Sequence, residues 1–332
     1  MTDIIRWGIL GTGNIAGHFA EGLKQLDDAE LAAVGSRSTA TANDFADQHG
    51  VAHRHGSYAG LVEDADVDVV YVATPHPFHK DNVMLSLSAG KPVLCEKPLS
   101  INTDDTATII AHAREKNLFL MEAMWSRFLP ALAKLRQLLA EDVIGDVQIL
   151  NADFGFKASG DPSGRLYNPA LAGGALLDVG IYPVSLAYML FGPPSKIASM
   201  GHIGPTGVDE QAAIILGYPD GALAVSYITI RAASPTEATL VGSKGRIHLH
   251  AEPGLFRPYR LTLSMPGRPD QHIDVPYEGN GYHYEAAEVM TCMRAGKIES
   301  DIMPLEESLS FIKTMDQIRS QWGLTYPMET TG

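Results

Sequence analysis

The chain has 332 residues, of which 45% are hydrophobic and 19% are charged, and its formal net charge is −14. This length predicts two domains, and the composition is that of a soluble globular protein rather than a disordered one. The acidic balance disfavours a nucleic-acid partner, because binding to phosphates requires clustered Lys and Arg.

The first part of the chain alternates strands with helices. Strands are expected at Ile4–Leu10, Leu31–Gly35, Val67–Ala73, Pro92–Cys95 and Leu118–Met124. Helices are expected after the first strand to about Leu26 and at Ala40–His49, Phe78–Ala89 and Thr103–Lys116. This alternation predicts a parallel, doubly wound Rossmann sheet, and we assign residues 1–124 to a dinucleotide-binding domain.

From Val147 onward, strands follow one another with few helices between them. Strands are expected at Val147–Phe154, Ile197–His202, Gln211–Leu216, Ala222–Ile230, Ala238–Val241 and Arg246–His250, and helices at Gly174–Leu190, Tyr284–Ala295 and Pro304–Trp322. This predicts a C-terminal α+β domain, residues 125–332, with an open-faced mixed, mainly antiparallel sheet. The last helices are free to pack back on the first domain. The open face suits a partner subunit, so we expect a homodimer or homotetramer.

No apolar run approaches the roughly 20 residues that span a bilayer, and the first residues lack the pattern of a signal peptide. The chain has two cysteines, Cys95 and Cys292, which lie far apart in the sequence. A disulfide framework is therefore not expected, and we expect a cytoplasmic protein without a membrane partner.

The first strand runs directly into a glycine-rich segment, Gly11-Thr12-Gly13-Asn14-Ile15-Ala16. In the pattern G-x-G-x-x-A, Gly11 permits a tight turn, Gly13 lets the backbone approach a pyrophosphate, and Ala16 allows a helix to pack closely on the strand. The N-terminus of that helix offers N–H groups to phosphates. Because the segment lies between a strand and a helix, it predicts a dinucleotide site rather than an ordinary glycine turn.

The end of the second strand determines which nicotinamide cofactor is preferred. An acidic residue there would bind the ribose hydroxyls and repel a 2′-phosphate, but this chain has Gly35-Ser36-Arg37-Ser38. Ser36 can donate a hydrogen bond, and Arg37 can pair with a phosphate or stack on adenine. We therefore expect NADP, with NAD possible.

Two further segments carry groups suited to proton transfer. Glu96-Lys97-Pro98 follows a strand at the carboxyl edge of the sheet, where Lys97 can polarise a substrate oxygen and Glu96 can position it. In the segment 173–183, Asp178 and Tyr182 face the same way if the segment is helical, and the phenol can exchange a proton with a carbonyl oxygen. The alternatives are that the first segment is an ordinary surface loop and that Tyr182, in the second segment, is a core tyrosine. Pro183 indicates a kink or a helix start.

Together, these motifs and Ala73-Thr74-Pro75…His79 resemble the glucose–fructose oxidoreductase / inositol dehydrogenase / rhizopine catabolism family (Gfo/Idh/MocA). The resemblance covers essentially the whole chain. Most of that family has His where this chain has Tyr182, which points to the branch of dimeric dihydrodiol dehydrogenase and NADP-dependent D-xylose dehydrogenase. It implies that Lys97, Asp178 and Tyr182 are catalytic, with Tyr182 as acid/base, and that Arg37 reads the 2′-phosphate.

The remaining site expectations concern the cofactor edge and the substrate. The cofactor-binding set is Gly11, Thr12, Gly13, Asn14, Ile15, Ser36, Arg37, Thr74, Pro75, His79, Glu96 and Lys97. Trp125 and Phe154 are candidate aromatic walls for a substrate, although such residues are often core, and Arg127 is a candidate for a substrate hydroxyl or an interdomain carboxylate. No metal is expected, because no cysteine or carboxylate cluster accompanies His76 and His79. His53, His55, His248 and His250 are read as exposed loop or strand residues.

The expected activity is hydride transfer between NADP and a secondary alcohol or hemiacetal carbon of a sugar, polyol or cyclic trans-diol. One alternative keeps the fold but uses NAD on inositol or a related sugar. Another is a non-catalytic regulator that senses a dinucleotide or sugar. The intact set of Lys97, Asp178 and Tyr182 favours an enzyme over a sensor.

Overall fold

The computed structural model describes residues 4–252 and 254–330. These form two compact units. The first comprises residues up to Trp125 together with Glu278–Leu309, and the second comprises Ser126–Tyr277 together with residues from Ser310 onward. The sequence led us to place one boundary after residue 124; in the structure, the late segment Glu278–Leu309 also belongs to the first unit.

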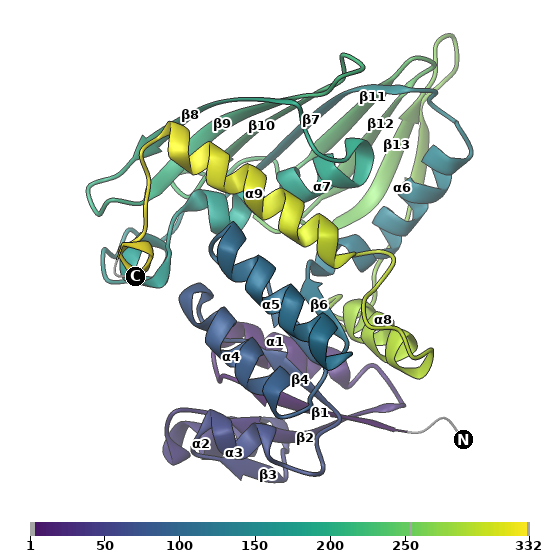
Figure 1. Cartoon of the computed structure of the whole chain (residues 1–332). Coiled ribbons are helices and arrows are strands. Elements are labelled where there is room, and N and C mark those ends of the chain that lie inside the picture. Colours follow the sequence, from purple (N-terminus) through teal and green to yellow (C-terminus); the bar gives the residue numbers. More distant parts are fainter. Residues whose placement is uncertain (1–3, 253, 331–332) are drawn as a thin grey trace. The chain divides into compact units, whose positions relative to one another are not determined.

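The sheet of the first unit is parallel and has the strand order β3-β2-β1-β4-β5-β6 (Figure 1). Its strands are β1 (Ile5–Leu10), β2 (Ala29–Gly35), β3 (His53–His55), β4 (Val69–Val72), β5 (Val93–Glu96) and β6 (Leu120–Ala123). Its helices are α1 (Asn14–Leu23), α2 (Thr39–His49), α3 (Tyr58–Val62), α4 (His79–Ser88), α5 (Thr103–Lys116) and α8 (His283–Arg294). The strand order reverses direction between β1 and β4, which is where doubly wound sheets bind ligands. The predicted Rossmann architecture is confirmed.

The strands of this sheet are buried because helices cover both faces. Every residue of β4 and β5 is buried, as expected for central parallel strands with continuous apolar sequence. The edge strand β3 and the helix α3 were missed from the sequence. Since β3 is only the tripeptide His53-Arg54-His55, it shows no apolar alternation.

The second unit contains an eight-stranded sheet with the order β14-β13-β12-β11-β7-β10-β9-β8. Its strands are β7 (Val147–Gly155), β8 (Lys196–Ile203), β9 (Asp209–Gly217), β10 (Leu223–Thr229), β11 (Ala238–Gly242), β12 (Arg246–Ala251), β13 (Pro258–Ser264) and β14 (Gln271–Asp274). β7 and β10 run parallel, and the other neighbouring pairs run antiparallel. The predicted mixed, mainly antiparallel sheet is confirmed, with β13 and β14 added to the expected strands.

Helices lie along one face of this sheet. They are α6 (Pro130–Ala140), which packs on β13, α7 (Ile181–Phe191), which packs on β7, and the C-terminal part of α9 (Leu305–Gln321), as Figure 1 shows. The opposite face carries exposed apolar side chains on β7 to β10. They are Ile149, Met200, Ile215, Leu223, Val225 and Tyr227.

One helical run, Pro169–Phe191, is long and apolar enough to cross a membrane by length and composition. The expectation that no apolar run approaches this length was therefore wrong. However, 83% of its most apolar stretch is buried inside the protein, which is the behaviour of a core helix.

Candidate active site

The glycine-rich turn between β1 and α1 has the geometry of a phosphate cradle. Gly11 has a φ of +112°, and a Cβ there would lie 2.9 Å from the backbone oxygen of Ala73, so a side chain is excluded. Gly13 is the N-cap of α1, and a Cβ at this position would meet no protein atom within 4 Å. Protein packing therefore does not require glycine at position 13, whereas close approach of a ligand would. Ala16 is fully buried, as its packing role requires.

The start of α1 also has the electrostatics of an anion site. Its N-cap makes no side-chain hydrogen bond, and its first turn contains no acidic residue. The first N–H groups of a helix have no partner within the helix, and the helix dipole favours negative charge beside them. These features fit a dinucleotide pyrophosphate, with Thr12, Asn14 and Ile15 half-buried or exposed beside it.

At the end of β2, two serines organise the loop and Arg37 is exposed. Ser36 is buried, and its Oγ lies 2.6 Å from Thr41 Oγ1. Ser38 caps α2 by accepting a hydrogen bond from the backbone N–H of Thr41, at 3.3 Å. Ser38 is thus engaged as a helix cap, and Arg37 is the cationic side chain that the loop presents to solvent.

His79 links two loops at the carboxyl edge of the sheet. It is fully buried, and its two ring nitrogens each lie 2.7 Å from a backbone carbonyl oxygen, that of Thr74 after β4 and that of Pro98 after β5. Thr74 Oγ1 accepts a hydrogen bond from Asn82, and Pro75 precedes the 3-10 turn His76–Phe78. His79 therefore positions the loops that carry Thr74 and Lys97. The ring of His79 is itself buried, and its assignment to the cofactor-binding set stays a prediction.

Lys97 stands at the end of β5, where Glu96 holds its backbone. The carboxylate of Glu96 accepts hydrogen bonds from the N–H of Lys97, at 3.1 Å, and from the hydroxyl of Tyr71. Burial and the neighbouring Glu96 raise the pKa of Tyr71 well above its ordinary value, so the phenol remains a donor. The peptide bond between Lys97 and Pro98 is cis. Trp125 is buried in the same unit and packs on Tyr282 with ring centroids 4.9 Å apart.

In the second unit, Asp178 and Tyr182 lie on one continuous helical segment. Asp178 belongs to a π-helical stretch, Leu176–Gly180, and Tyr182 to the first turn of α7. Arg165 donates a hydrogen bond to Asp178 Oδ1 at 2.9 Å. The glycines before this segment permit close approach, since a Cβ on Gly173 would lie 2.6 Å from the backbone oxygen of Arg165.

Tyr182 lies among aromatic rings and beside an anchored arginine. Its ring centroid is 5.2 Å from that of Phe154 and 5.6 Å from that of Phe256. Arg127 is buried and donates hydrogen bonds to Oγ and the backbone oxygen of Ser185, one turn along α7. Arg127 thus anchors to α7 through Ser185, and its expected role toward a substrate hydroxyl or an interdomain carboxylate stays a prediction. A cavity of about 10 Å³ is lined by Ser126, Arg127, Leu132, Tyr182, Ser185, Leu186, Met189 and Phe256.

Sequence reasoning missed several residues of this arrangement. Asp209 accepts a hydrogen bond from the backbone N–H of Leu176 at 2.7 Å and so holds the start of the helix that carries Asp178. Complete burial raises the pKa of Asp209 to about 7. Arg165 and Phe256 lie outside the motif of Asp178 and Tyr182, and Ser185, one turn after Tyr182, carries no local signal for its contact with the distant Arg127.

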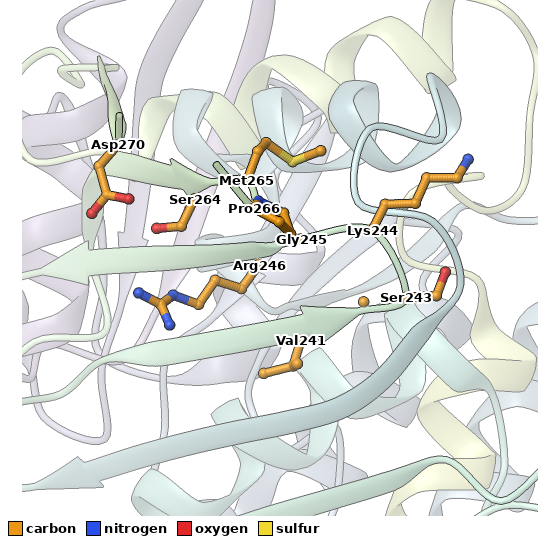
Figure 2. A pocket seen from close by; sticks show the side chains of 10 residues that line it. Val241, Ser243, Lys244, Gly245, Arg246, Ser264, Met265, Pro266 and Asp270 are labelled. Atoms are coloured by element: carbon orange, nitrogen blue, oxygen red, sulfur yellow. The ribbon is translucent and has the colours of Figure 1, made fainter. Parts of the chain in front are cut away.

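A larger surface depression lies elsewhere in the second unit. Its volume is about 410 Å³, and Figure 2 shows its lining at the turn between β11 and β12 and at the end of β13. It includes Ser243, Lys244 and Arg246 but none of the residues expected at the active site. The depression is wide open and holds none of the predicted catalytic or cofactor-binding residues, so we assign the chemistry to the motifs described above.

Both parts of the chain match known protein families. Residues 5–124 match a model described as an oxidoreductase family with an NAD-binding Rossmann fold, and residues 132–248 match the GFO/IDH/MocA C-terminal domain. The trans-1,2-dihydrobenzene-1,2-diol dehydrogenase of Mus musculus is 37% identical over 337 residues, 98% of this chain and 99% of the relative. The Homo sapiens enzyme of the same name is 37% identical over 334 residues, with 98% and 99% coverage.

Solved structures share the fold. A 3-ketoreductase from Actinomadura kijaniata, in complex with NADP and TDP-benzene, has a TM-score of 0.84 at 26% identity, covering 96% of this chain and 98% of that chain. An aldose-aldose oxidoreductase from Caulobacter crescentus has a TM-score of 0.86 at 23% identity, with the same coverage. The chain belongs to the Gfo/Idh/MocA family of oxidoreductases and is an NAD(P)-dependent dehydrogenase.

Proposed function

We propose that this protein moves a hydride between NADP and a secondary alcohol or hemiacetal carbon of a cyclic trans-diol or sugar. The observation that carries the proposal is Tyr182, a phenol set among Phe154 and Phe256 on the same helical segment as Asp178. An aromatic lining suits the apolar face of a ring that carries hydroxyl groups. The diol dehydrogenases that resemble this chain over nearly its full length support this substrate class.

The preference for NADP rests on the loop after β2. No carboxylate follows the strand, and the exposed Arg37 supplies a guanidinium that can form paired hydrogen bonds to a phosphate. The similar 3-ketoreductase was crystallised with NADP. We expect Gly11, Gly13 and the start of α1 to hold the pyrophosphate, and Thr74, Pro75 and Glu96 to lie along the cofactor edge.

We assign proton transfer to Tyr182, with Lys97 and Asp178 completing the catalytic set. When bound, the nicotinamide supplies the site that accepts or donates the hydride. In the oxidative direction, the Tyr182 phenolate takes the proton of the substrate hydroxyl as the hydride leaves carbon, and in the reductive direction the Tyr182 phenol returns that proton. Lys97 polarises the substrate oxygen, and Arg165 holds the Asp178 carboxylate in place.

The substrate class is tested with the purified full-length chain, NADP⁺ or NAD⁺, and a panel of trans-dihydrodiols, aldoses and inositols, by following the absorbance of reduced nicotinamide. Faster turnover of trans-diols or aldoses with NADP⁺ supports the proposal. Turnover of inositols with NAD⁺ would favour the inositol dehydrogenase alternative. Dinucleotide binding without turnover of any panel member would favour a sensor.

We also propose that the chain self-associates through the open face of the eight-stranded sheet, in a cytoplasmic setting. The exposed apolar side chains on β7 to β10 support self-association, because contiguous apolar surface of this kind is unusual on a monomer. Replacement of Val225 and Tyr227 by Glu should produce a monomer in light scattering. A matched change on the same face, Asn151→Glu, should shift the equilibrium less.

A further inference from the structure

Two histidines and a glutamate converge on the open face of the eight-stranded sheet. His248 and His250 are two residues apart on β12, so both side chains point to the same face. Glu237 lies just before β11, the neighbouring strand. One potential ligand atom from each residue lies within 4.8 Å of the others, and Glu237 Oε2 is 3.3 Å from His248 Nε2. We call these three residues the β12 cluster.

Threonine hydroxyls on the flanking strands fix the two imidazole rings. His248 pairs with Thr239 on β11, and its Nδ1 lies 2.8 Å from Thr239 Oγ1. His250 Nε2 lies 2.8 Å from Thr262 Oγ1 on β13. Each hydroxyl can accept the ring N–H, which leaves Nε2 of His248 and Nδ1 of His250 with a lone pair. Histidines that bind metals commonly donate their other ring nitrogen to an oxygen in this way.

The same threonine completes a chain of hydrogen bonds to a third histidine. Thr262 Oγ1 is 3.0 Å from Nδ1 of His272 on β14. If Thr262 accepts the N–H of His250, its own hydroxyl proton points to His272. The orientation of His250 is therefore supported on both sides of Thr262, and His272 serves as part of that support.

The chemistry of the three side chains suits a transition-metal ion. The nearby cation, Arg260, is paired with Asp274. The β12 cluster thus offers two imidazole nitrogens and one carboxylate, the donor set of a three-ligand zinc site.

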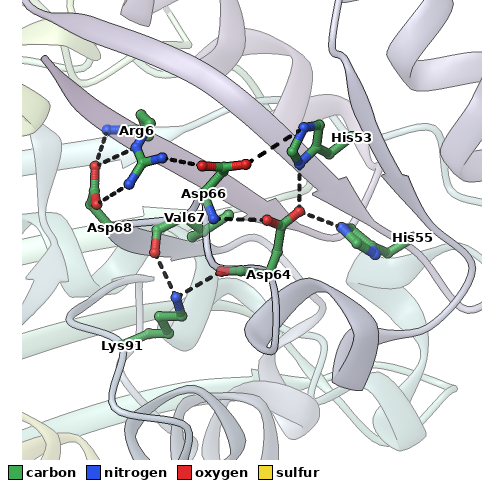
Figure 3. A network of polar contacts seen from close by, with 8 residues as sticks. All are labelled: Arg6, His53, His55, Asp64, Asp66, Val67, Asp68 and Lys91. Atoms are coloured by element: carbon green, nitrogen blue, oxygen red, sulfur yellow. Dashed lines mark hydrogen bonds and ion pairs between the residues drawn. The ribbon is translucent and has the colours of Figure 1, made fainter.

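A second group of similar composition lies in the first unit, but its ligands are already engaged. Figure 3 shows Asp64 Oδ2 accepting hydrogen bonds from His53 Nδ1, at 2.7 Å, and His55 Nε2, at 2.8 Å. Asp64 Oδ1 accepts the N–H of Asp66, and Arg6 binds Asp66 and Asp68 in the same network. A metal ion there would have to displace hydrogen bonds from both histidines, whereas at the β12 cluster it would replace the single contact between His248 and Glu237.

We propose that Glu237, His248 and His250 bind a divalent transition-metal ion of the zinc type, with water in the fourth tetrahedral position. Zinc requires its donor atoms at roughly 2.0–2.2 Å, so the three side chains, whose donor atoms lie within 4.8 Å of one another, rotate toward the ion on binding. This departs from the expectation of no metal, which considered only His76 and His79. His248 and His250 were interpreted as exposed loop or strand residues, because the register across β11, β12 and β13 that brings Glu237 beside them is not visible in the sequence.

The test titrates the metal-free full-length protein with Co²⁺ and measures visible absorption, followed by Zn²⁺ competition with a chromogenic chelator. The proposal predicts one Co²⁺ per chain with the intense bands of tetrahedral coordination, and loss of those bands in the His248→Ala/His250→Ala double variant. Thr239→Val, which keeps all three ligands, should weaken Zn²⁺ binding about 10- to 100-fold. His272→Ala should weaken it less.

The matched control is the His53→Ala/His55→Ala double variant, in which the β12 cluster is intact. It should bind Co²⁺ as the unmodified chain does. Tetrahedral bands that persist in the His248→Ala/His250→Ala variant, or that disappear only in the His53→Ala/His55→Ala variant, would overturn the proposal. If the His248→Ala/His250→Ala variant fails to fold, equal Zn²⁺ affinity of Thr239→Val and the unmodified chain would overturn it instead.

Discussion

Asp178 and Tyr182 are four residues apart on one helical segment that is π-wound at Asp178 and α-wound at Tyr182. Pro183 explains the change, because its ring has no N–H to donate and would crowd the carbonyl of Val179 in a regular α-helix. π-helical turns of this kind are often found at functional sites. The wider π-helical turn changes the angle between the directions of the Asp178 and Tyr182 side chains. The four-residue spacing in the sequence therefore does not by itself determine that angle.

Tyr182→Phe removes the proposed acid/base while keeping the ring that packs on Phe154 and Phe256. We expect kcat to fall by about 100- to 10,000-fold, because a general acid/base contributes that much. Dinucleotide affinity and the melting temperature should be unchanged. Full activity in this variant would rule out the assignment of Tyr182.

Arg37→Ala tests cofactor choice. The loss of charge-assisted hydrogen bonds to a 2′-phosphate should raise KM for NADP⁺ by about 10- to 100-fold, since such bonds contribute about 1.5–3 kcal/mol. KM for NAD⁺ should change little, because NAD⁺ lacks that phosphate. Arg54→Ala, which removes another arginine of this unit that pairs with Asp47, is the control. Equal increases in KM for NADP⁺ and NAD⁺ would contradict the proposed role of Arg37.

Gly13→Ala separates cofactor binding from folding. A Cβ at Gly13 meets no protein atom within 4 Å, so the free energy of unfolding should fall by only about 1 kcal/mol through the weaker N-cap. Dinucleotide binding should weaken strongly, because the methyl group occupies the space of the pyrophosphate. The control is Gly17→Ala on the same helix, where a Cβ would lie 3.5 Å from His49. If calorimetry shows unchanged dinucleotide affinity in Gly13→Ala, the turn at Gly13 does not bind the pyrophosphate as proposed.

Asp209 should make stability depend on pH. Its pKa is raised by burial from 3.8 to about 7, so the folded chain retains a proton there that the unfolded chain loses above about pH 4. The contribution of this group to stability therefore falls as pH rises from about 4 to about 7. The amide side chain introduced by Asp209→Asn stays neutral at every pH, so the stability of this variant should not decline between about pH 4 and pH 7. Urea unfolding midpoints across this range measure it, and parallel profiles for the two proteins would show that Asp209 does not titrate as described.

Much of the first unit was predictable because its signals are local. The apolar run of β4 and the glycine turn with Gly11 and Gly13 depend on neighbours in the sequence. The polar edge strand β3 was missed because it is held by pairing with β2, which no local pattern reports. In the second unit, α6 was also missed, although Pro130 at its first turn is a recognisable start signal.

The candidate site was predictable only in part, because its supporting residues come from distant segments. Tyr182 and Asp178 lie in a motif, whereas Arg165 and Asp209 support the helix from 13 and 33 residues away. Arg127 was recognised as a candidate, but its partner Ser185 lies 58 residues later. The β12 cluster likewise depends on strand register, which brings Thr239 and Thr262 beside His248 and His250.

The central claim is hydride transfer to NADP⁺ from a carbinol carbon, and isotope transfer tests it most directly. The unmodified chain is incubated with NADP⁺ and a trans-dihydrodiol deuterated at the carbinol carbons, and the reduced cofactor is examined by mass spectrometry. Our account predicts one deuterium in each NADPH formed. NADPH without deuterium, or bound NADP⁺ that is never reduced although the protein is folded, would contradict it.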